Sequence, residues 1–341
     1  MRLFVVTQAV DVRDPVLGFF VGWVGELAKH FERIEVVCLR EGEHAFPANV
    51  GVHSLGKERG RPVFGAAAYA LRFLALAWHL RESYDAVLVH MNQEYILIAG
   101  WLWKIFGKRV FLWRNHYAGS LLTDFAAAFS TKVLYTSRSS YTARYEKAVR
   151  MPVGVDTARF HPDGTTLRVP GSILFLARMA PSKRPEILVD ALARLTRKNI
   201  DFTATFVGSP RSQDTTYYKR LMARVESLGL SNHVIFTPGL PNIETPALYR
   251  SHDIFVNASP SGMLDKTIFE AAASGCAVLA SSEDIKEQLG DEYYFATVDE
   301  LADKLQKLIS SPSTHREQLA KLAEDNSLLQ LGVTLTQAIG V

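Results

Sequence analysis

The chain has 341 residues, of which 48% are hydrophobic and 21% are charged. Its length exceeds the size at which one hydrophobic core usually stops growing, so two domains are expected, and the ordinary composition excludes a disordered or low-complexity protein. The net charge of +3 is too small to indicate nucleic-acid binding. The His residues are scattered and the two Cys residues lie in apolar runs, so we expect neither a zinc site nor a disulfide.

Apolar runs of strand length alternate with helical patterns through the first half of the chain. The predicted strands are 3–7, 34–39, 86–90, 110–113 and 133–136, and the predicted helices are 18–31, 65–80 and 95–106. This alternation is typical of a parallel α/β sheet. The chain starts with a strand pattern rather than a signal peptide, which predicts a cytoplasmic location.

The second half repeats the α/β pattern independently. Its predicted strands are 173–176, 203–207, 233–236, 254–256 and 277–280. The fold class is therefore α/β, with two Rossmann-like parallel-sheet domains that face each other across a ligand-binding cleft. The predicted domains are residues 1–160 and 172–314, joined by a Pro- and Gly-containing linker at 161–171, and a helical segment at 315–341 is expected to return to the first domain.

An anion site is predicted where the strand at 173–176 ends. Arg178 and Lys183 follow this apolar strand, and Pro185 suits the first turn of the amphipathic helix behind it. Cations beside a helix N-terminus suit a diphosphate, although a solvated basic turn is the simpler alternative. The chain has no Gly-x-Gly-x-x-Gly motif after a strand and no Walker-type loop, which disfavours a dinucleotide enzyme and a P-loop NTPase.

Four segments in order resemble the retaining glycosyltransferases of the GT-B fold, specifically glycosyltransferase family 4. They are MPVGVDTARFHP (151–162), LARMAPSKRPEILVDAL (176–192), VIFTPGLPNIETPALYRSHDIFVNAS (234–259) and SPSGMLDKTIFEAAASGCAVLAS (259–281). The resemblance implies transfer of a hexose from UDP or GDP to a glycan or lipid-linked acceptor in polysaccharide or glycoconjugate biosynthesis. The donor is expected on the C-terminal domain and the acceptor on the N-terminal domain, with no cofactor and no metal.

The same resemblance assigns roles to single residues. Arg178 and Lys183 match the cations that bind the diphosphate, and His116 matches the histidine that points at the transferred sugar; these three are the expected catalytic residues. Donor binding is further expected from Gly18 beside the phosphates and from Glu270 on the ribose hydroxyls. The turn that contains Gly239 and Leu240 is expected near the base.

The signature block departs from the family pattern at one position. Gly262 replaces the first of the two paired glutamates, and the residues that follow, also expected at the donor, are Met263, Leu264, Asp265 and Lys266. Asp265 could cap the helix, and Lys266 could reach a phosphate. The departure motivates an alternative hypothesis, a nucleotide-sugar-binding protein of the same fold without transferase activity. A phosphorylase or epimerase on this fold fits the motifs less well.

Charge is distributed unevenly along the chain. Residues 1–155 contain 19 Lys and Arg against 13 Asp and Glu, a net charge of +6. A basic N-terminal domain could contact the inner face of the cell membrane as a peripheral protein. The candidate membrane face comprises Trp101, Trp103, Lys104, Phe106, Lys108, Arg109 and Trp113. The alternative is that several of these side chains belong to the core.

Overall fold

The computed structural model describes residues 1–60, 65–311 and 316–341. The chain divides into two compact units. The N-terminal unit comprises residues 1–154, 241–243 and 328–341, and the C-terminal unit comprises residues 155–240 and 244–327. Each unit is built on its own parallel sheet, so the predicted α/β class with two Rossmann-like sheets is confirmed.

The sheet of the N-terminal unit has the order β3-β2-β1-β4-β5-β6-β7, and each neighbouring pair is parallel. Its strands are β1 (Arg2–Val10), β2 (Arg33–Glu41), β3 (Val50–Ser54), β4 (Ala86–His90), β5 (Arg109–Trp113), β6 (Lys132–Tyr135) and β7 (Ala148–Arg150). The central strands are buried on both faces, which explains their continuous apolar runs.

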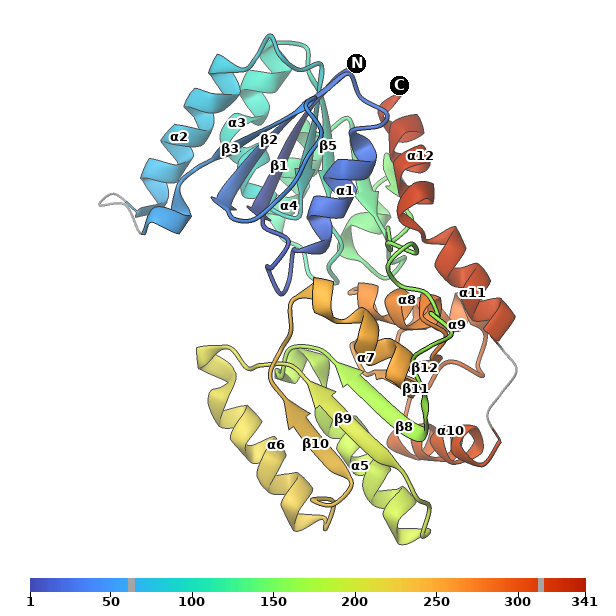
Figure 1. The fold of residues 1–341 in the computed structure, drawn as a ribbon. Coiled ribbons are helices and arrows are strands. Elements are labelled where there is room, and N and C mark those ends of the chain that lie inside the picture. The colour runs from blue at the N-terminus through green and yellow to red at the C-terminus, as the bar shows by residue number, and fades with distance from the viewer. Residues whose placement is uncertain (61–64, 312–315) are drawn as a thin grey trace. The chain divides into compact units, whose positions relative to one another are not determined.

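Helices cover both faces of this sheet (Figure 1). Alternate residues of β1 show the two layers, because side chains along a strand point to opposite faces. Leu3 and Val5 pack in the core beneath α1 (Phe19–Leu27) and α12 (Leu328–Ile339). Phe4 and Val6 pack in the opposite core, beneath α2 (Gly65–His79), α3 (Glu94–Ile105) and α4 (Leu121–Phe129).

The sheet of the C-terminal unit has the order β10-β9-β8-β11-β12. Its strands are β8 (Val169–Leu176), β9 (Thr203–Val207), β10 (Val234–Thr237), β11 (His252–Asn257) and β12 (Ala277–Ala280). The chain builds outward from β8 to β10 and then returns to add β11 on the other side of β8. The carboxyl ends of β8 and β11 therefore form a topological switch point, where ligands bind in open α/β sheets.

The helices of the C-terminal unit also form two layers (Figure 1). One core packs beneath α5 (Pro185–Arg197), α6 (Thr215–Ser227) and α10 (Val298–Ser310). On the opposite face, α7 (Pro246–Ser251) and α8 (Lys266–Ala273) lie against β11, and α11 (Arg316–Asp325) packs on α8. Helix α9 (Glu283–Leu289) follows β12.

The units divide at different residues from those predicted. The boundary lies between Gly154 and Val155, and the segment 161–171 lies within the C-terminal unit, where its last residues begin β8. Packing explains the shift, because the buried ring of Phe160 contacts Tyr249 of α7 at a centroid distance of 5.8 Å. Within the C-terminal segment, only α12 belongs to the N-terminal unit, whereas α11 belongs to the C-terminal unit. The predicted boundary at 314/315 lies outside the described residues.

Three elements are absent from the sequence prediction: β3, β7 and α4. Strands β3 and β7 are short edge strands of half-buried residues. Helix α4 has an inverted pattern, because its small residues face the sheet and its large apolar residues face outward. Both cysteines, Cys38 and Cys276, are buried free thiols. In the part of the chain that the structure describes, no helix has the length and apolar character needed to cross a membrane.

Candidate donor site

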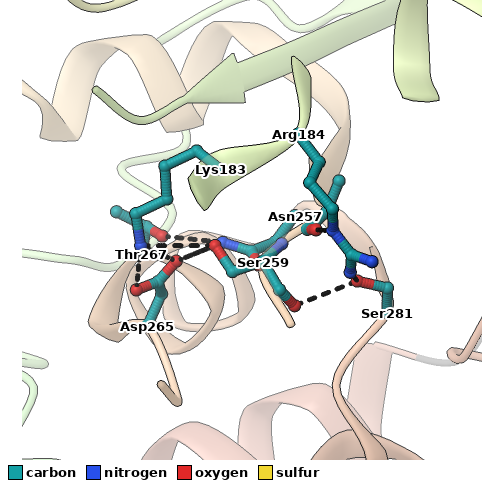
Figure 2. A network of polar contacts seen from close by, with 8 residues as sticks. Lys183, Arg184, Asn257, Ser259, Asp265, Thr267 and Ser281 are labelled. Carbon is teal, nitrogen blue, oxygen red and sulfur yellow. Dashed lines mark hydrogen bonds and ion pairs between the residues drawn. The ribbon is translucent and has the colours of Figure 1, made fainter. Parts of the chain in front are cut away.

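The loops after β8 and β11 meet at the switch point of the C-terminal unit. Lys183 reaches from the first loop to the second, where its Nζ lies 2.6 and 2.7 Å from the two carboxylate oxygens of Asp265. The carboxylate also accepts hydrogen bonds from Asn257 Nδ2, at 3.0 Å, and from the hydroxyl of Ser259. Figure 2 shows this network. Burial alone would raise the pKa of Asp265, but the charge of Lys183 and these hydrogen bonds together lower it.

This geometry revises what the sequence suggested for Asp265. The residue occupies the N-cap position of α8 in extended conformation, but its side chain makes no capping hydrogen bond. Its carboxylate instead neutralises Lys183, the residue expected to bind the diphosphate. Lys183 therefore stands in the expected place with a preformed internal partner.

Arg184, the residue after Lys183, holds the loops that follow β11 and β12. Its Nε donates to the carbonyl oxygen of Ala258 at 2.6 Å, and one of its terminal nitrogens donates to Ser281 Oγ at 2.7 Å. The loops after β11 and β12 are thereby fixed to the start of α5. The sequence analysis gave Arg184 no role. Arg184 occupies the N-cap position of α5 with a left-handed backbone, at a φ of +49°.

Arg178 differs from both neighbouring cations. Its side chain is half-buried at the end of β8, and among the described residues no hydrogen bond or ion pair of its guanidinium is found. Burial lowers its pKa, and the like charge of Arg211 acts in the same direction. Arg178 is thus a partly desolvated cation at the switch point, which favours an anionic ligand.

Lys266 is the first residue of α8 and, after Arg178, the second basic residue of this site with a lowered pKa. Burial lowers its pKa to about 7, although the nearby carboxylates of Glu270 and Asp156 oppose this shift. A neutral lysine becomes charged at little cost when an anion arrives. Lys266 lies at the first position of α8, and its contact with a phosphate stays a prediction.

Glu270 lies one turn further along α8 and is 2% exposed. Its Oε2 accepts a hydrogen bond from the hydroxyl of Tyr249 at 2.9 Å, inside the unit. Burial and this carboxylate raise the pKa of Tyr249 well above its usual value, so the phenol stays a donor. The sequence analysis missed Tyr249, because an aromatic residue in a short helix pattern does not reveal a polar partner.

The loop between β11 and α8 contains Gly262 in a left-handed conformation, with φ of +86°. L-residues with side chains rarely adopt this φ, so the backbone at position 262 suits glycine. Leu264 is buried beneath the loop, and Met263 is half-buried. The four residues after Gly262 therefore contribute one apolar anchor, Leu264, and the two charged residues Asp265 and Lys266.

A glycine turn lies at the ends of β9 and β10. The backbone N–H of Gly239 donates to Ser209 Oγ at 3.0 Å, and a side chain at Gly239 would approach Gly208. Gly208 itself packs so closely on the carbonyl oxygen of Ala177 that a Cβ could not fit. Leu240 is half-buried beside Gly239. The sequence analysis named Gly239 and Leu240 but missed Gly208 and Ser209, although a glycine directly after a buried strand was a usable signal.

Two candidate residues belong to the N-terminal unit. Gly18 precedes α1, and a Cβ there would lie 2.7 Å from the carbonyl oxygens of Val12 and Asp14, so close packing of the loop explains this glycine. His116 is half-buried in the loop after β5, where its Nδ1 accepts a hydrogen bond from the N–H of Ala118 at 2.9 Å. The same Nδ1 also lies 3.3 Å from the carbonyl oxygen of Ala118, so two backbone atoms of Ala118 hold the imidazole ring.

The described residues offer no group of three or more His, Cys, Asp or Glu side chains that could hold a metal ion. The charges at the switch point are instead those of Arg178, Lys183 and Lys266, set against Asp265 and Glu270. These side chains and the N-termini of α5 and α8 could together hold a phosphorylated ligand.

The chain is similar in sequence to known proteins. Residues 170–311 match the family model described as "Glycosyl transferases group 1". The curated D-inositol 3-phosphate glycosyltransferase of Acidothermus cellulolyticus is 30% identical over 153 residues, which cover 41% of this chain and 34% of that protein. A GDP-mannose-dependent phosphatidylinositol monomannoside mannosyltransferase of Mycolicibacterium smegmatis is 31% identical over 146 residues, or 38% and 37% of the two chains. The chain therefore matches about a third of the length of these relatives.

Solved structures match over the whole chain. The sucrose-phosphate synthase of Thermosynechococcus elongatus aligns with a TM-score of 0.78 at 15% identity, covering 99% of this chain and 98% of that one. Anabaena HepE in complex with UDP and glucose aligns with a TM-score of 0.76 at 20% identity and the same coverage. At these identities the likeness shows the fold alone, and the GT-B fold expected from the four sequence segments is confirmed.

Proposed function

We propose that this chain, whose residues 170–311 match the model of the group 1 glycosyltransferases, transfers a hexose from a nucleotide-sugar donor to an acceptor, with retention at the anomeric carbon. The observation that carries the proposal is the set of cations at the ends of β8 and β11. Arg178 is half-buried without an internal hydrogen bond among the described residues, and Lys266 has a pKa lowered to about 7. Arg178 is arranged for an anionic ligand, and Lys266, at the start of α8, adds a second cation to the site.

In the proposed reaction the nucleoside diphosphate is the leaving group, and its negative charge increases as the bond to the sugar breaks. Arg178 and Lys266 stabilise that charge. Lys183 also stabilises it when the phosphates compete with Asp265 for the Lys183 ammonium group. This arrangement could act without a divalent ion, and we propose that it does. The turn at Gly208, Ser209 and Gly239 is assigned to the base.

Glu270 is assigned to the ribose, with Tyr249 orienting its carboxylate through Oε2. His116 is assigned to the transferred sugar, because it matches the family histidine and its ring is held by two backbone contacts to Ala118. HepE was crystallised with UDP and glucose, and one mannosyltransferase relative is named as GDP-mannose-dependent. UDP- and GDP-hexoses are therefore the donors to test first, and a glycan or lipid-linked molecule is the proposed acceptor.

The test begins with binding. Thermal unfolding of the full chain is followed with UDP, GDP, ADP and their common sugar conjugates, because a ligand that binds only the folded state raises the midpoint. We expect one nucleotide family to stabilise the wild type and to lose this effect in Arg178→Ala. Equal midpoints with all of these ligands would contradict the proposal.

A nucleotide-sugar-binding protein without transferase activity is the second candidate, and one observation favours it. Gly262 stands where the family has its first glutamate, in a backbone conformation that suits glycine. Donor turnover separates the two candidates. NMR of the donor incubated with protein should show release of the sugar or its transfer as the retained anomer, also in the presence of a chelator. Binding without any turnover would identify the second candidate.

A further inference from the structure

Helices α3 and α4 expose an apolar surface that the donor chemistry does not explain. We define the α3–α4 face as Trp101, Ile105, Leu121, Leu122, Phe125 and Phe129. Ile105 is 70% exposed and Leu121 is 75% exposed. Large side chains scattered singly over a surface need no explanation, but six on two neighbouring helices mark an interaction surface.

The α3–α4 face is continuous across the two helices, which lie side by side in the N-terminal unit (Figure 1). Gly100 of α3 allows this approach, because a Cβ there would lie 3.1 Å from the ring of Phe129. Along α4, the residues that pack inward are the small ones: Thr123, Ala126 and Ala127. Helix α4 therefore presents its large apolar side chains outward, the reverse of an ordinary surface helix.

The chain segment that carries most of this face is basic. Residues 100–150, which include the second half of α3 and all of α4, contain nine Lys and Arg and two Asp and Glu, a net charge of +7. Lys104 is exposed between Trp101 and Ile105. The acidic residue of α4, Asp124, is paired with Arg144 at 2.7 Å and accepts hydrogen bonds from Tyr141 and Tyr145. The occupant of the face should therefore be anionic.

We propose that the α3–α4 face docks on an anionic lipid bilayer. An apolar helix face on a basic chain segment, with Lys104 exposed within it, suits the boundary between acyl chains and anionic headgroups. Trp101 fits this medium, because its indole N–H already donates to the carbonyl oxygen of Ile98 at 2.8 Å. A second copy of the chain fits poorly, since a two-fold contact would bring two segments of charge +7 together.

The structure also revises which residues form the membrane face. Of the seven residues named from the sequence, Trp103 and Trp113 are buried in the two cores. Lys108 donates to the carbonyl oxygen of Tyr84, and Arg109 donates to that of Ile339. Trp101 and Lys104 remain exposed, and α4 supplies most of the new face.

The docking surface deepens the proposed function, because it names the environment from which the N-terminal unit takes its acceptor. Tyr117, stacked on His116 at 4.5 Å and 52% exposed, lies just before α4. A lipid-linked acceptor in the bilayer would then be presented beside the loop that carries His116. This inference rests on the proposed function only for the identity of the acceptor.

The test is flotation of the full chain with vesicles of neutral phosphatidylcholine and with vesicles that also contain phosphatidylglycerol. No donor is added, so the result is independent of transferase activity. We expect binding to the anionic vesicles, weakened by salt. The double variant Leu122→Gln/Phe125→Gln should lower the bound fraction by roughly tenfold, since two exposed anchors are lost.

The matched control is Leu167→Gln/Ile235→Gln, which changes two apolar residues of the C-terminal unit that are 90% and 61% exposed. It should float like the wild type, and circular dichroism should show the same fold for all three proteins. Equal flotation of wild type and α3–α4 variant, or none by the wild type, would overturn the proposal. A wild-type dimer that the α3–α4 variant converts to monomer would assign the face to a second copy instead.

Discussion

Arg178 and Arg184 lie in one loop and have the same side chain, but their surroundings differ. Arg184 bridges Ala258 and Ser281, whereas no internal hydrogen bond of Arg178 is found among the described residues. Substitution of each should therefore affect a different property. A hydrogen bond from a charged group contributes about 1.5–3 kcal/mol. For Arg184 this free energy contributes to the stability of the fold, and for Arg178 we expect it to contribute to ligand binding.

We predict that Arg178→Ala lowers donor affinity roughly 10- to 100-fold, with little change in the unfolding midpoint of the free protein. Arg184→Ala should lower the free energy of unfolding by about 1–3 kcal/mol, because two loops lose their clamp. Calorimetric titration and denaturant unfolding measure the two effects. Strong destabilisation by Arg178→Ala would show that its guanidinium has a structural role.

Lys266 gives the donor site a pH dependence. Its pKa of about 7 means that it is largely neutral above pH 7 in the free protein, and a bound diphosphate stabilises its charged form. Binding above pH 7 must therefore include proton uptake, and donor affinity should fall as pH rises from 7 to 8.5. Titration calorimetry in buffers with different ionisation enthalpies measures this uptake.

Lys266→Met should bind the donor more weakly at pH 6.5 and should lose most of this pH dependence. Asp265 and Glu270 are unchanged in this variant. A change in the slope of donor affinity against pH therefore reports the titration of Lys266. A wild-type affinity that is constant between pH 6.5 and 8.5 would be incompatible with a poised lysine at the diphosphate.

A candidate site residue could be predicted from the sequence where its signal lies within one short segment. Arg178 and Lys183 follow from a buried strand that ends in a basic loop, a signal contained in a dozen residues. Asp265 could not be assigned to Lys183 in this way, because the ion pair joins positions 82 residues apart. The same holds for the hydrogen bond from Tyr249 to Glu270, which depends on how α7 and α8 pack.

At the scale of elements, the loop between β11 and α8 turns at Gly262 in a left-handed conformation. A glutamate at position 262 would have to adopt φ near +86°, which costs about 1–2 kcal/mol for an L-residue. We predict that Gly262→Glu, which introduces the residue expected from the family resemblance, lowers stability by this amount and does not increase turnover. Unfolding and donor-turnover assays measure both effects.

Gly164→Glu is the matched control for this strain. Gly164 has a φ of +71° with open space around its Cβ position, in the same unit. Its substitution should lower stability to a similar extent and leave donor binding unchanged. If Gly262→Glu raised turnover while Gly164→Glu did not, the loop would accommodate the family glutamate after all.

Element prediction succeeded where burial and periodicity agree. Strands β4, β9 and β12 have the predicted bounds, because their apolar runs are enclosed on both sides. Helix α4 was missed for a physical reason, since its apolar side chains point outward and give no polar face to mark it. Helix α4, which departs from the ordinary pattern of a surface helix, is thus also part of the face that we propose docks on the membrane.

At the scale of the whole molecule, the chain crosses between the units four times, at 154/155, 240/241, 243/244 and 327/328. The residues that begin and end the C-terminal unit lie together, because Val155 pairs with Ser327 in a parallel bridge and its N–H donates to the carbonyl oxygen of Asn326. The N-terminal unit is therefore completed only when α12 has been made. No local pattern in the first half of the sequence reveals this dependence.

We predict that a chain ending at residue 327 loses stability selectively in its N-terminal unit. Leu331, Leu335 and Ile339 of α12 are almost fully buried in the core beneath α1, and each buried side chain of this size contributes about 1.5–3 kcal/mol. Their sum is comparable with the whole stability of a typical domain. The C-terminal unit keeps its own sheet and its cation site, so nucleotide binding should persist.

Tryptophan fluorescence measures the loss directly, because all five Trp residues belong to the N-terminal unit and Trp23 packs against Trp113 at 4.7 Å in the affected core. The truncated chain should show a lower midpoint in this signal, while a nucleotide still raises a separate transition of the C-terminal unit. The substitution Leu329→Gln in the full chain is the control, since this α12 side chain is 64% exposed. Simultaneous loss of both transitions on truncation would mean that the two units fold as one cooperative body.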